Sequence, residues 1–509
     1  MKKADLAPWL TLPAFLAGIF LIIPLVTITL RTPWTDFISL ITTDVSIDAL
    51  TLSAKTCAIT LVVSLLLGVP LAFALAHLPD NWWARLIRTV VTLPMMLPPV
   101  VAGLALLLTW GRRGLIGEHL SVLGIEIGFS TLAVVMAQTF VAMPFLVSSL
   151  EGAIRSSGIE YDEAARALGA SRTRTFFEVT VPVMLPAIIN AGCMCLSRAL
   201  GEFGATITFA GSLQGTTQTM PLAIYLQRQS STDEALALAV VLIIAAIAIL
   251  YGGNLIASRL PGAKTEAQLR ARDLVRAKKM SLKEQPDTIP QVITRPKSAR
   301  PSTCPSISID AEVADRGVHM QVEIPGGTLT SVMGPNGSGK STLLGLISQT
   351  LEPSSGTVTF DPPNPQIVLL QQKPLLFPHM NVLKNVKFGL RERGLNKEAV
   401  EARAKAELAS VGLSAMAKRR PSQLSGGQAQ RVAIARAMAI DPDIVLLDEP
   451  MAGLDELSAN SVREDLANRM TASLFTAVLV THDVADAERL ASSKILIRHG
   501  RVEKSQLVD

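Results

Sequence analysis

Residues 334–342, GPNGSGKST, have the composition and spacing of a loop that binds phosphate. An apolar run at 329–333 precedes them and a helical pattern at 343–347 follows, as a strand and a helix would flank such a loop. Glycines let the backbone wrap a phosphate, and N–H groups at the helix N-terminus face the anion. Lys340 can neutralise the β and γ phosphates, and the Ser341 hydroxyl can coordinate Mg²⁺. The sequence therefore predicts a nucleotide site formed by Gly334, Pro335, Asn336, Gly337, Ser338, Gly339, Lys340, Ser341 and Thr342.

A second pattern supplies the groups that hydrolysis needs. Residues 444–450, IVLLDEP, are typical of a buried strand that ends in two carboxylates. Asp448 is placed to hold Mg²⁺, directly or through water, and Glu449 to orient and polarise the attacking water. An apolar run before Asp-Glu is common on its own, but its position downstream of the phosphate loop makes it specific.

Between these two patterns lies LSGGQ, residues 424–428, followed by a helical stretch. Ser425, Gly426 and Gly427 open this helix, and helix N-termini attract anions. LSGGQ resembles the signature sequence of ABC ATPases, and this resemblance covers about residues 306–500. It implies ATP as the nucleotide. It also implies that Ser425, Gly426, Gly427 and Gln428 serve the γ-phosphate held by the opposite subunit, so we expect a homodimer with two shared ATP sites.

The resemblance assigns three further residues. It implies that Gln372 is a Q-loop glutamine that reaches Mg²⁺ and the coupling helix, and that Asp455 belongs to a D-loop at 453–455. It also implies that His482, in VTHD, contacts the γ-phosphate. These ATPases usually stack an aromatic residue on adenine, yet residues 307–333 contain no Phe, Tyr or Trp, so we expect aliphatic side chains or His319 there. The chain ends about ten residues after its last strand-like run, 494–498, so we expect no C-terminal regulatory domain.

The first half of the chain reads as a membrane domain. The chain of 509 residues is 49% hydrophobic with a mean hydropathy of +0.38, too apolar for a wholly soluble protein. About 20 apolar residues span a bilayer, and six runs qualify: 9–30, 56–78, 89–110, 131–150, 183–210 and 236–257. The first is too long for a signal peptide and lacks a convincing cleavage site. The four cysteines lie mostly in apolar runs and have no metal-ligand spacing.

We therefore predict an all-α permease domain of six transmembrane helices at 1–258 and a cytoplasmic α/β ATPase domain of the phosphate-loop class at 306–509. A basic, Pro-rich linker at 259–305 joins them, and its basic part could touch anionic lipid, although a solvated flank is favoured. Nucleic acid is not an expected partner.

The basic residues predict the orientation of the membrane domain. Lys and Arg concentrate on one side of the membrane, the cytoplasmic side in most membrane proteins. With the N-terminus inside, the inner segments before the last span carry Lys2, Lys3, Arg85, Arg88, Arg155, Arg166, Arg172 and Arg174, and the outer loops carry Arg31, Arg112, Arg113 and Arg228. We predict a multi-pass protein of the cytoplasmic (inner) membrane with both termini and the ATPase domain in the cytoplasm.

A polar stretch at 160–179 interrupts the apolar runs on the predicted cytoplasmic side. Glu163, Ala164, Ala165 and Gly169 in it have the spacing of the EAA coupling loop in permease subunits of ABC-type importers, which they resemble. The small alanines let a helix pack closely on a partner, Gly169 is predicted to end the helix, and Pro182 to start the next span. An ordinary amphipathic connector is the alternative.

The fifth predicted span contains Arg198 and Glu202, four residues apart and so on one helical face. Charges inside a span are costly unless they are paired or face water. The pair is either a gate in the translocation path or a buried structural pair, and it more readily shapes a gate than binds an anionic cargo.

Residues 196–225, LSRALGEFGATITFAGSLQGTTQTMPLAIY, closely resemble the corresponding region of molybdate permeases. The resemblance implies import of molybdate or tungstate, with an external binding protein that delivers the oxyanion. A sulfate or other tetrahedral-oxyanion importer is the alternative within transporters, and an exporter would lack the EAA spacing. A membrane-anchored ABC ATPase acting as a sensor or regulator is the alternative from another class.

Overall fold

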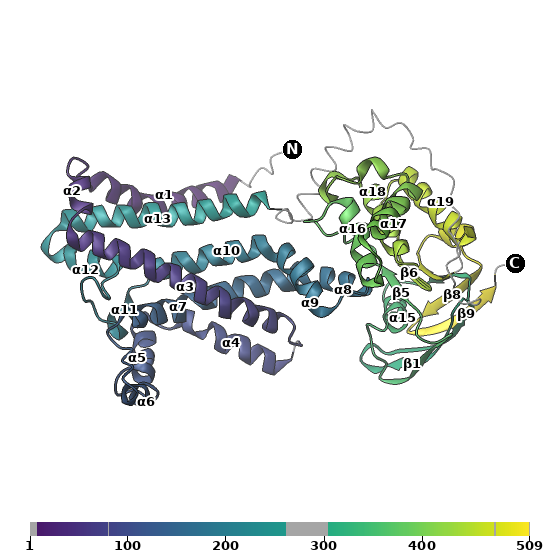
Figure 1. Ribbon diagram of the computed structural model, residues 1–509, viewed down its shortest axis with the longest axis horizontal. Coiled ribbons are helices and arrows are strands. Elements are labelled where there is room, and N and C mark those ends of the chain that lie inside the picture. The colour runs from purple at the N-terminus through teal and green to yellow at the C-terminus, as the bar shows by residue number, and fades with distance from the viewer. Residues whose placement is uncertain (1–7, 80, 261–303, 453, 473–474, 508–509) are drawn as a thin grey trace. The chain divides into compact units, whose positions relative to one another are not determined.

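The computed structural model describes residues 8–79, 81–260, 304–452, 454–472 and 475–507. By their packing, the chain divides into a helical unit, residues 1–156 and 184–263, and a sheet unit, residues 157–183 and 264–509 (Figure 1). The polar stretch predicted to couple the two domains therefore groups with the sheet unit. Nearly all of the predicted linker, at 261–303, lies outside the described residues, as does Gly453 of the predicted D-loop.

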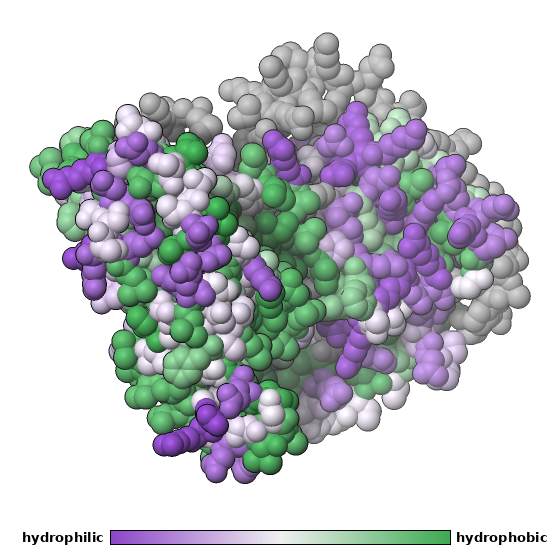
Figure 2. Space-filling view, turned by 60° about the vertical axis from the view of Figure 1, so that its left-hand side comes forward, coloured by the Kyte–Doolittle hydropathy of each residue, from purple (hydrophilic) through white to green (hydrophobic). Residues whose placement is uncertain are grey.

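The helical unit is built from long apolar helices. Five stretches of the described chain are long and apolar enough to cross a membrane: Thr11–Arg31, Asp44–Ala76, Thr131–Ser156, Arg172–Leu200 and Thr232–Arg259. Figure 2 shows broad hydrophobic areas over this unit. Its helices are α1 (Pro8–Arg31), α2 (Phe37–Ile41), α3 (Asp44–Ala76), α4 (Trp82–Met96), α5 (Pro99–Trp110), α6 (Gly117–Val122), α7 (Thr131–Ala153), η1 (Ile154–Gly158), α10 (Val181–Leu200), α11 (Gly204–Phe209), α12 (Met220–Ser230) and α13 (Thr232–Arg259).

Two predicted spans were wrong in detail. The third, 89–110, is not one helix, because α4 and α5 meet at 108° across Leu97 and Pro98. Counted as one broken span, this pair brings the total to six. The fifth, 183–210, stops at Leu200, and α11 follows after a break. At its other end, helical turns already begin at Arg172, before Pro182.

Two sheets organise the described part of the sheet unit. The antiparallel sheet has the order β2-β1-β4, made of β1 (Ser306–Val313), β2 (Val318–Ile324) and β4 (Ser355–Asp361). The larger sheet has the order β5-β6-β7-β3-β8-β9, made of β3 (Leu329–Met333), β5 (Ile367–Leu370), β6 (Ile444–Asp448), β7 (Thr476–Val480), β8 (Ser493–Arg498) and β9 (Arg501–Leu507). It is parallel except for β9, which pairs antiparallel with β8. The sequence prediction took β8 as the last strand and missed β9.

Helices flank the larger sheet and complete the core. Strands β3, β6 and β7 are buried along almost their whole length, as expected of parallel strands covered on both faces. Their apolar side chains pack with those of β1, β2 and α15 in one cluster. The helices are α8 (Ile159–Ala167), α9 (Arg172–Thr175), η2 (Phe176–Thr180), η3 (Ala314–Arg316), α15 (Lys340–Ile347), α16 (Val382–Leu390), η4 (Arg391–Arg393), α17 (Lys397–Ser410), η5 (Ser414–Met416), η6 (Pro421–Gln423), α18 (Gly426–Ala439), α19 (Glu456–Ala472) and α20 (Val484–Leu490).

Candidate functional site

The phosphate loop connects β3 to α15, as the sequence predicted. Gly334, Gly337 and Gly339 have φ values of 153°, 78° and 110°, which favour glycine. A Cβ on Gly334 would also lie 2.2 Å from the Ile497 carbonyl oxygen, so no side chain fits there. Lys340 is buried, and its Nζ donates hydrogen bonds to the carbonyl oxygens of Gly334 (2.7 Å) and Pro335 (2.9 Å). The loop thus folds around its own lysine and keeps this cation beside the open N-terminus of α15.

Three predicted residues meet beside this loop. Glu449 follows β6, Gln372 follows β5 and His482 follows β7, so all three leave the same edge of a parallel sheet. Gln372 Nε2 donates to Glu449 Oε2 (3.2 Å), and His482 Nδ1 lies 3.2 Å from Glu449 Oε1. The Glu449 backbone is held by a hydrogen bond from its N–H to the carbonyl oxygen of Val480 (2.9 Å). The carboxylate is therefore fixed from both sides next to the phosphate loop.

Asp448 is the last residue of β6 and neighbours Glu449. Burial raises the pKa of its carboxyl, the neighbouring Glu449 raises it further, and the Lys340 ammonium lowers it. Two adjacent carboxylates beside one lysine leave negative charge that a cation could neutralise.

The signature residues lie at the start of α18. Ser425 caps the helix by accepting a hydrogen bond from the Gln428 N–H (3.3 Å), and Gln428 Oε1 accepts one from the Ser425 N–H (3.1 Å). Gly427 packs against the helix after the D-loop, because a Cβ there would lie 2.6 Å from Ser458 Cβ. Asp455 caps that helix, α19, through bonds from the Ser458 N–H (3.0 Å) and hydroxyl (2.8 Å). The structure thus joins the signature residues to the D-loop region of the same chain.

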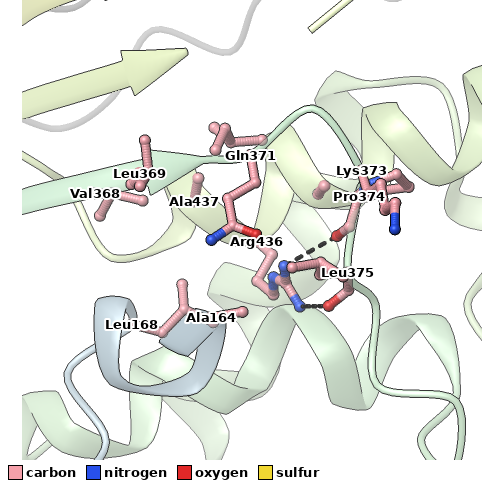
Figure 3. Close-up of a pocket in the computed structure, with 12 residues that line it drawn as sticks. Ala164, Leu168, Val368, Leu369, Gln371, Lys373, Pro374, Leu375, Arg436 and Ala437 are labelled. Carbon is pink, nitrogen blue, oxygen red and sulfur yellow. Dashed lines mark hydrogen bonds between the residues drawn. The ribbon is translucent and has the colours of Figure 1, made fainter. Parts of the chain in front are cut away.

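The coupling stretch forms α8, which packs into the sheet unit. Ala165 and Leu168 are buried, whereas Glu163 is exposed. As predicted, the helix ends before Gly169, whose φ of 85° suits only glycine. Figure 3 shows Ala164 and Leu168 at a cavity of about 20 Å³, which is lined by Ala164, Leu168, Val368, Leu369, Leu370, Gln371, Lys373, Pro374, Leu375, Ala433, Arg436 and Ala437. The segment after Gln372 and the signature helix α18 both line this cavity.

Arg436, on α18, is the buried cation of this cavity, whereas the Lys373 side chain is exposed. Its guanidinium is buried and donates to the carbonyl oxygens of Leu375 (3.0 Å) and Pro374 (3.1 Å), as the dashed lines in Figure 3 show. Burial lowers its pKa to about 10, although Tyr161 of α8 raises it. Its Nε has no hydrogen-bond partner among the described residues. Arg436 therefore ties the signature helix to the segment after Gln372, at the cavity that Ala164 of α8 also lines.

Charged side chains hold the rest of the coupling stretch. Arg174 bonds to Glu392 and to the Phe388 carbonyl oxygen (3.0 Å), and its guanidinium lies 4.6 Å from the centroid of the Phe388 ring. Glu178 lies 3.4 Å from Arg391, and its backbone carbonyl accepts a bond from His379 Nε2 (2.7 Å). The coupling stretch therefore also contacts α16, η4 and the segment before α16.

In the helical unit, Arg198 and Glu202 form an ion pair of 2.8 Å. The prediction that they share one helical face was wrong, because α10 ends at Leu200 and Glu202 lies in the break before α11. The Glu202 side chain is 1% exposed and that of Arg198 30%. Glu202 Oε1 also accepts a hydrogen bond from the Ala205 N–H (2.8 Å). The pair therefore links the end of α10 to the start of α11.

Two family models match this chain. "ABC transporter" matches residues 318–452, which hold the phosphate loop, the signature and both carboxylates. "Binding-protein-dependent transport system inner membrane component" matches residues 68–257. The "Molybdenum transport system permease protein ModB" of Mycobacterium tuberculosis (strain H37Rv) is 48% identical over 49% of this chain and 94% of ModB. This chain belongs to the ABC transporter family.

Two ATP-binding relatives match the other half of this ABC transporter. The "Molybdenum import ATP-binding protein ModC" of the same strain is 39% identical over 38% of the chain, which spans 58% of the length of ModC. The "Sulfate/thiosulfate import ATP-binding protein CysA" of Mycobacterium bovis is 41% identical over 36% of the chain and 55% of CysA. The predicted resemblance, with a permease and an ABC ATPase on one chain, is confirmed. The chain is a membrane protein that binds ATP and couples its hydrolysis to the import of an ion.

Removing Arg198 should destabilise the helical unit of the transporter. Arg198→Ala leaves Glu202 buried and charged without its partner, at a cost of about 3 kcal/mol. We expect a lower thermal unfolding midpoint in detergent, and the double variant Arg198→Ala/Glu202→Gln should recover most of the loss. Equal midpoints for the single variant and the original protein would contradict a structural role for the pair.

Sequence reasoning missed the contacts of Arg436, Glu178 and His379, and it used Arg174 only as a marker of membrane orientation. Each was visible only as a residue in a helical or polar stretch. The partners of Arg174 and Glu178 are about 200 residues away in the chain, and no local spacing predicts such pairs.

Proposed function

We propose that this ABC transporter imports molybdate, or the closely similar tungstate, across the cytoplasmic membrane. The observation that carries the proposal is that both halves resemble molybdenum-transport proteins, the helical half over nearly the whole length of ModB. The stretch 196–225, which the sequence analysis singled out, lies within the matched permease region.

The working assembly that we infer is a homodimer with an external binding protein. One chain carries one permease and one ATPase. Its signature residues, Ser425–Gln428, pack on α19 of the same chain. In the dimer, these signature residues face the ATP held by the phosphate loop of the second copy. The sheet unit and both termini lie in the cytoplasm, and the binding protein delivers the oxyanion on the other side.

Hydrolysis uses the residues that meet at the sheet edge. The Ser341 hydroxyl, the Gln372 amide oxygen and the Asp448 carboxylate are oxygen donors, which suit Mg²⁺, and they would hold it. Bound there, Mg²⁺ would offset charge on the β and γ phosphates. Glu449 orients and polarises the attacking water, while Lys340 and His482 contact the γ-phosphate. The Glu449 carboxylate accepts a hydrogen bond from Gln372 and contacts His482, and these two contacts orient it.

The same residues connect hydrolysis to transport. At one end of the segment 372–375, Gln372 donates a hydrogen bond to Glu449. At the other end, the carbonyl oxygens of Pro374 and Leu375 accept hydrogen bonds from Arg436, at the cavity that Ala164 of α8 also lines. When two ATPase domains close on ATP, the segment 372–375 shifts. Because this segment lines the same cavity as Ala164 and Leu168, the shift changes the surface on which they pack. We propose that α8 passes this shift to the membrane helices.

The substrate can be tested by ATPase stimulation. The full chain in liposomes, with its binding protein, should hydrolyse ATP faster when molybdate is added and accumulate labelled molybdate inside. Stimulation of ATP hydrolysis by sulfate but not by molybdate would contradict molybdate as the substrate and would favour sulfate. Sulfate is the second candidate because CysA, a sulfate/thiosulfate import protein, matches the ATPase half as well as ModC does.

A further inference from the structure

Two turns of the sheet unit enclose the phosphate loop on the side away from the hydrolytic residues. The β8–β9 turn contributes Gly500, whose N–H donates to the Ser338 carbonyl oxygen (3.0 Å). The β1–β2 turn joins it, because the His319 N–H donates to the Gly500 carbonyl oxygen (2.8 Å). A Cβ on Gly339 would lie 2.9 Å from the Met320 side chain, so β2 packs directly against the loop.

Arg316 stands at the tip of the β1–β2 turn. Gly317 follows with a φ of 61°, which turns the chain back into β2. The Arg316 guanidinium donates to Thr342 Oγ1 (3.4 Å), the last residue of the phosphate-loop motif. Arg316 is an exposed residue, so its guanidinium is accessible to a ligand. Arg316 is thus a second cation beside the loop, distinct from Lys340.

The strand order shows which end of ATP would meet Arg316. In the larger sheet, β3 lies between β7 and β8. Gln372, Glu449 and His482 follow β5, β6 and β7, on one side of β3, and this side takes the γ-phosphate in the site proposed above. The β8–β9 and β1–β2 turns lie on the other side. A triphosphate held along the loop therefore points its nucleoside toward these turns.

No aromatic ring of the segment 307–333 is available for the base. His319 was expected as one substitute, but β2 alternates buried and exposed residues, with Val318 and Met320 buried toward the loop and His319 exposed. Neighbours in a strand point to opposite faces, so His319 points away from the loop. Arg316, by contrast, contacts the loop itself.

We propose that the planar guanidinium of Arg316 is the surface on which the adenine base of ATP stacks. A guanidinium is flat, delocalised and weakly hydrated, and it stacks well on aromatic faces. Its bond to Thr342 fixes the plane at the nucleoside end of the loop. This inference rests on the ATP site proposed above.

The test separates base from phosphate recognition. Isothermal titration calorimetry on the full chain in detergent compares ADP with inorganic pyrophosphate, neither of which the ATPase reaction consumes. Arg316→Ala should weaken ADP binding about tenfold, the size of a cation–π or stacking contact, and leave pyrophosphate binding unchanged. Arg316→Phe, which keeps a flat face without charge, should restore ADP binding. Arg316→Lys, which keeps the charge without the plane, should not.

Other outcomes would overturn the inference. If Arg316→Ala weakened both ligands and Arg316→Lys restored both, the charge would act on phosphate and not on the base. If Arg316→Ala bound ADP normally and His499→Ala bound it more weakly, the adenine base would contact the β8–β9 turn and not Arg316. Lys340→Ala should weaken ADP and pyrophosphate together. Normal binding of both by that variant would overturn the phosphate site, a failure distinct from that of Arg316.

Discussion

Replacing Glu449 by glutamine should lower the rate of ATP hydrolysis on the order of a thousandfold, the usual contribution of a positioned general base. Glutamine has nearly the same size. Its oxygen can accept from Gln372, and its amide N–H can donate to Nδ1 of a neutral His482, so both contacts can persist. ATP affinity should remain close to that of the original protein, because Lys340 and the loop amides are untouched. Phosphate release measures the rate, and equilibrium binding of labelled ATP measures the affinity.

Glu456→Gln is the matched control for this prediction. Glu449, Gln372 and His482 line a cleft that Glu456 also lines. Glu456 is exposed in the first turn of α19. The same chemical change there should leave hydrolysis nearly unaltered. Rapid turnover by Glu449→Gln, or an equal loss in Glu456→Gln, would remove the water-activating role from Glu449.

The sequence predicted those features that are set by neighbouring residues. The phosphate loop, the end of β6 and the cap at Ser425 are each formed by residues within about ten positions of one another. Some backbone conformations are also indicated by residue type alone, such as the positive φ of Gly339 in the phosphate loop and of Gly169 after α8. For the same reason, the ends of α8 and α15 agree with the predicted turn and helix.

Features that depend on distant contacts or on the path of the chain could not be predicted. Apolar residues continue on both sides of Leu97 and Pro98, so a hydropathy window sees one span where α4 and α5 bend. Strand β9, RVEKSQL, is too polar to be recognised except by its pairing with β8. Arg174 contacts Glu392 because the fold of the sheet unit brings these two residues together, although they are 218 positions apart in the sequence.

A cation placed under α8 should uncouple the transporter. Leu168 is buried at the cavity that also contains the buried guanidinium of Arg436. Leu168→Lys would bury a second positive charge beside the first, and α8 should leave the cavity to avoid this cost. We expect uptake of labelled oxyanion into liposomes to fall tenfold or more, on the order expected for an unpaired buried charge, while ATP hydrolysis without oxyanion continues.

The sign of the charge distinguishes this account from a simple loss of packing. Leu168→Asp removes more apolar surface than Leu168→Lys, because lysine keeps a four-carbon stem. The aspartate variant can nevertheless pair its carboxylate with Arg436, whose Nε has no hydrogen-bond partner among the residues described. It should therefore retain more transport than Leu168→Lys. Leu168→Met, which keeps an apolar side chain, and Arg172→Gln, at an exposed position of the same stretch, should transport almost normally. If the lysine and aspartate variants lost transport equally, Arg436 would have no electrostatic part in coupling.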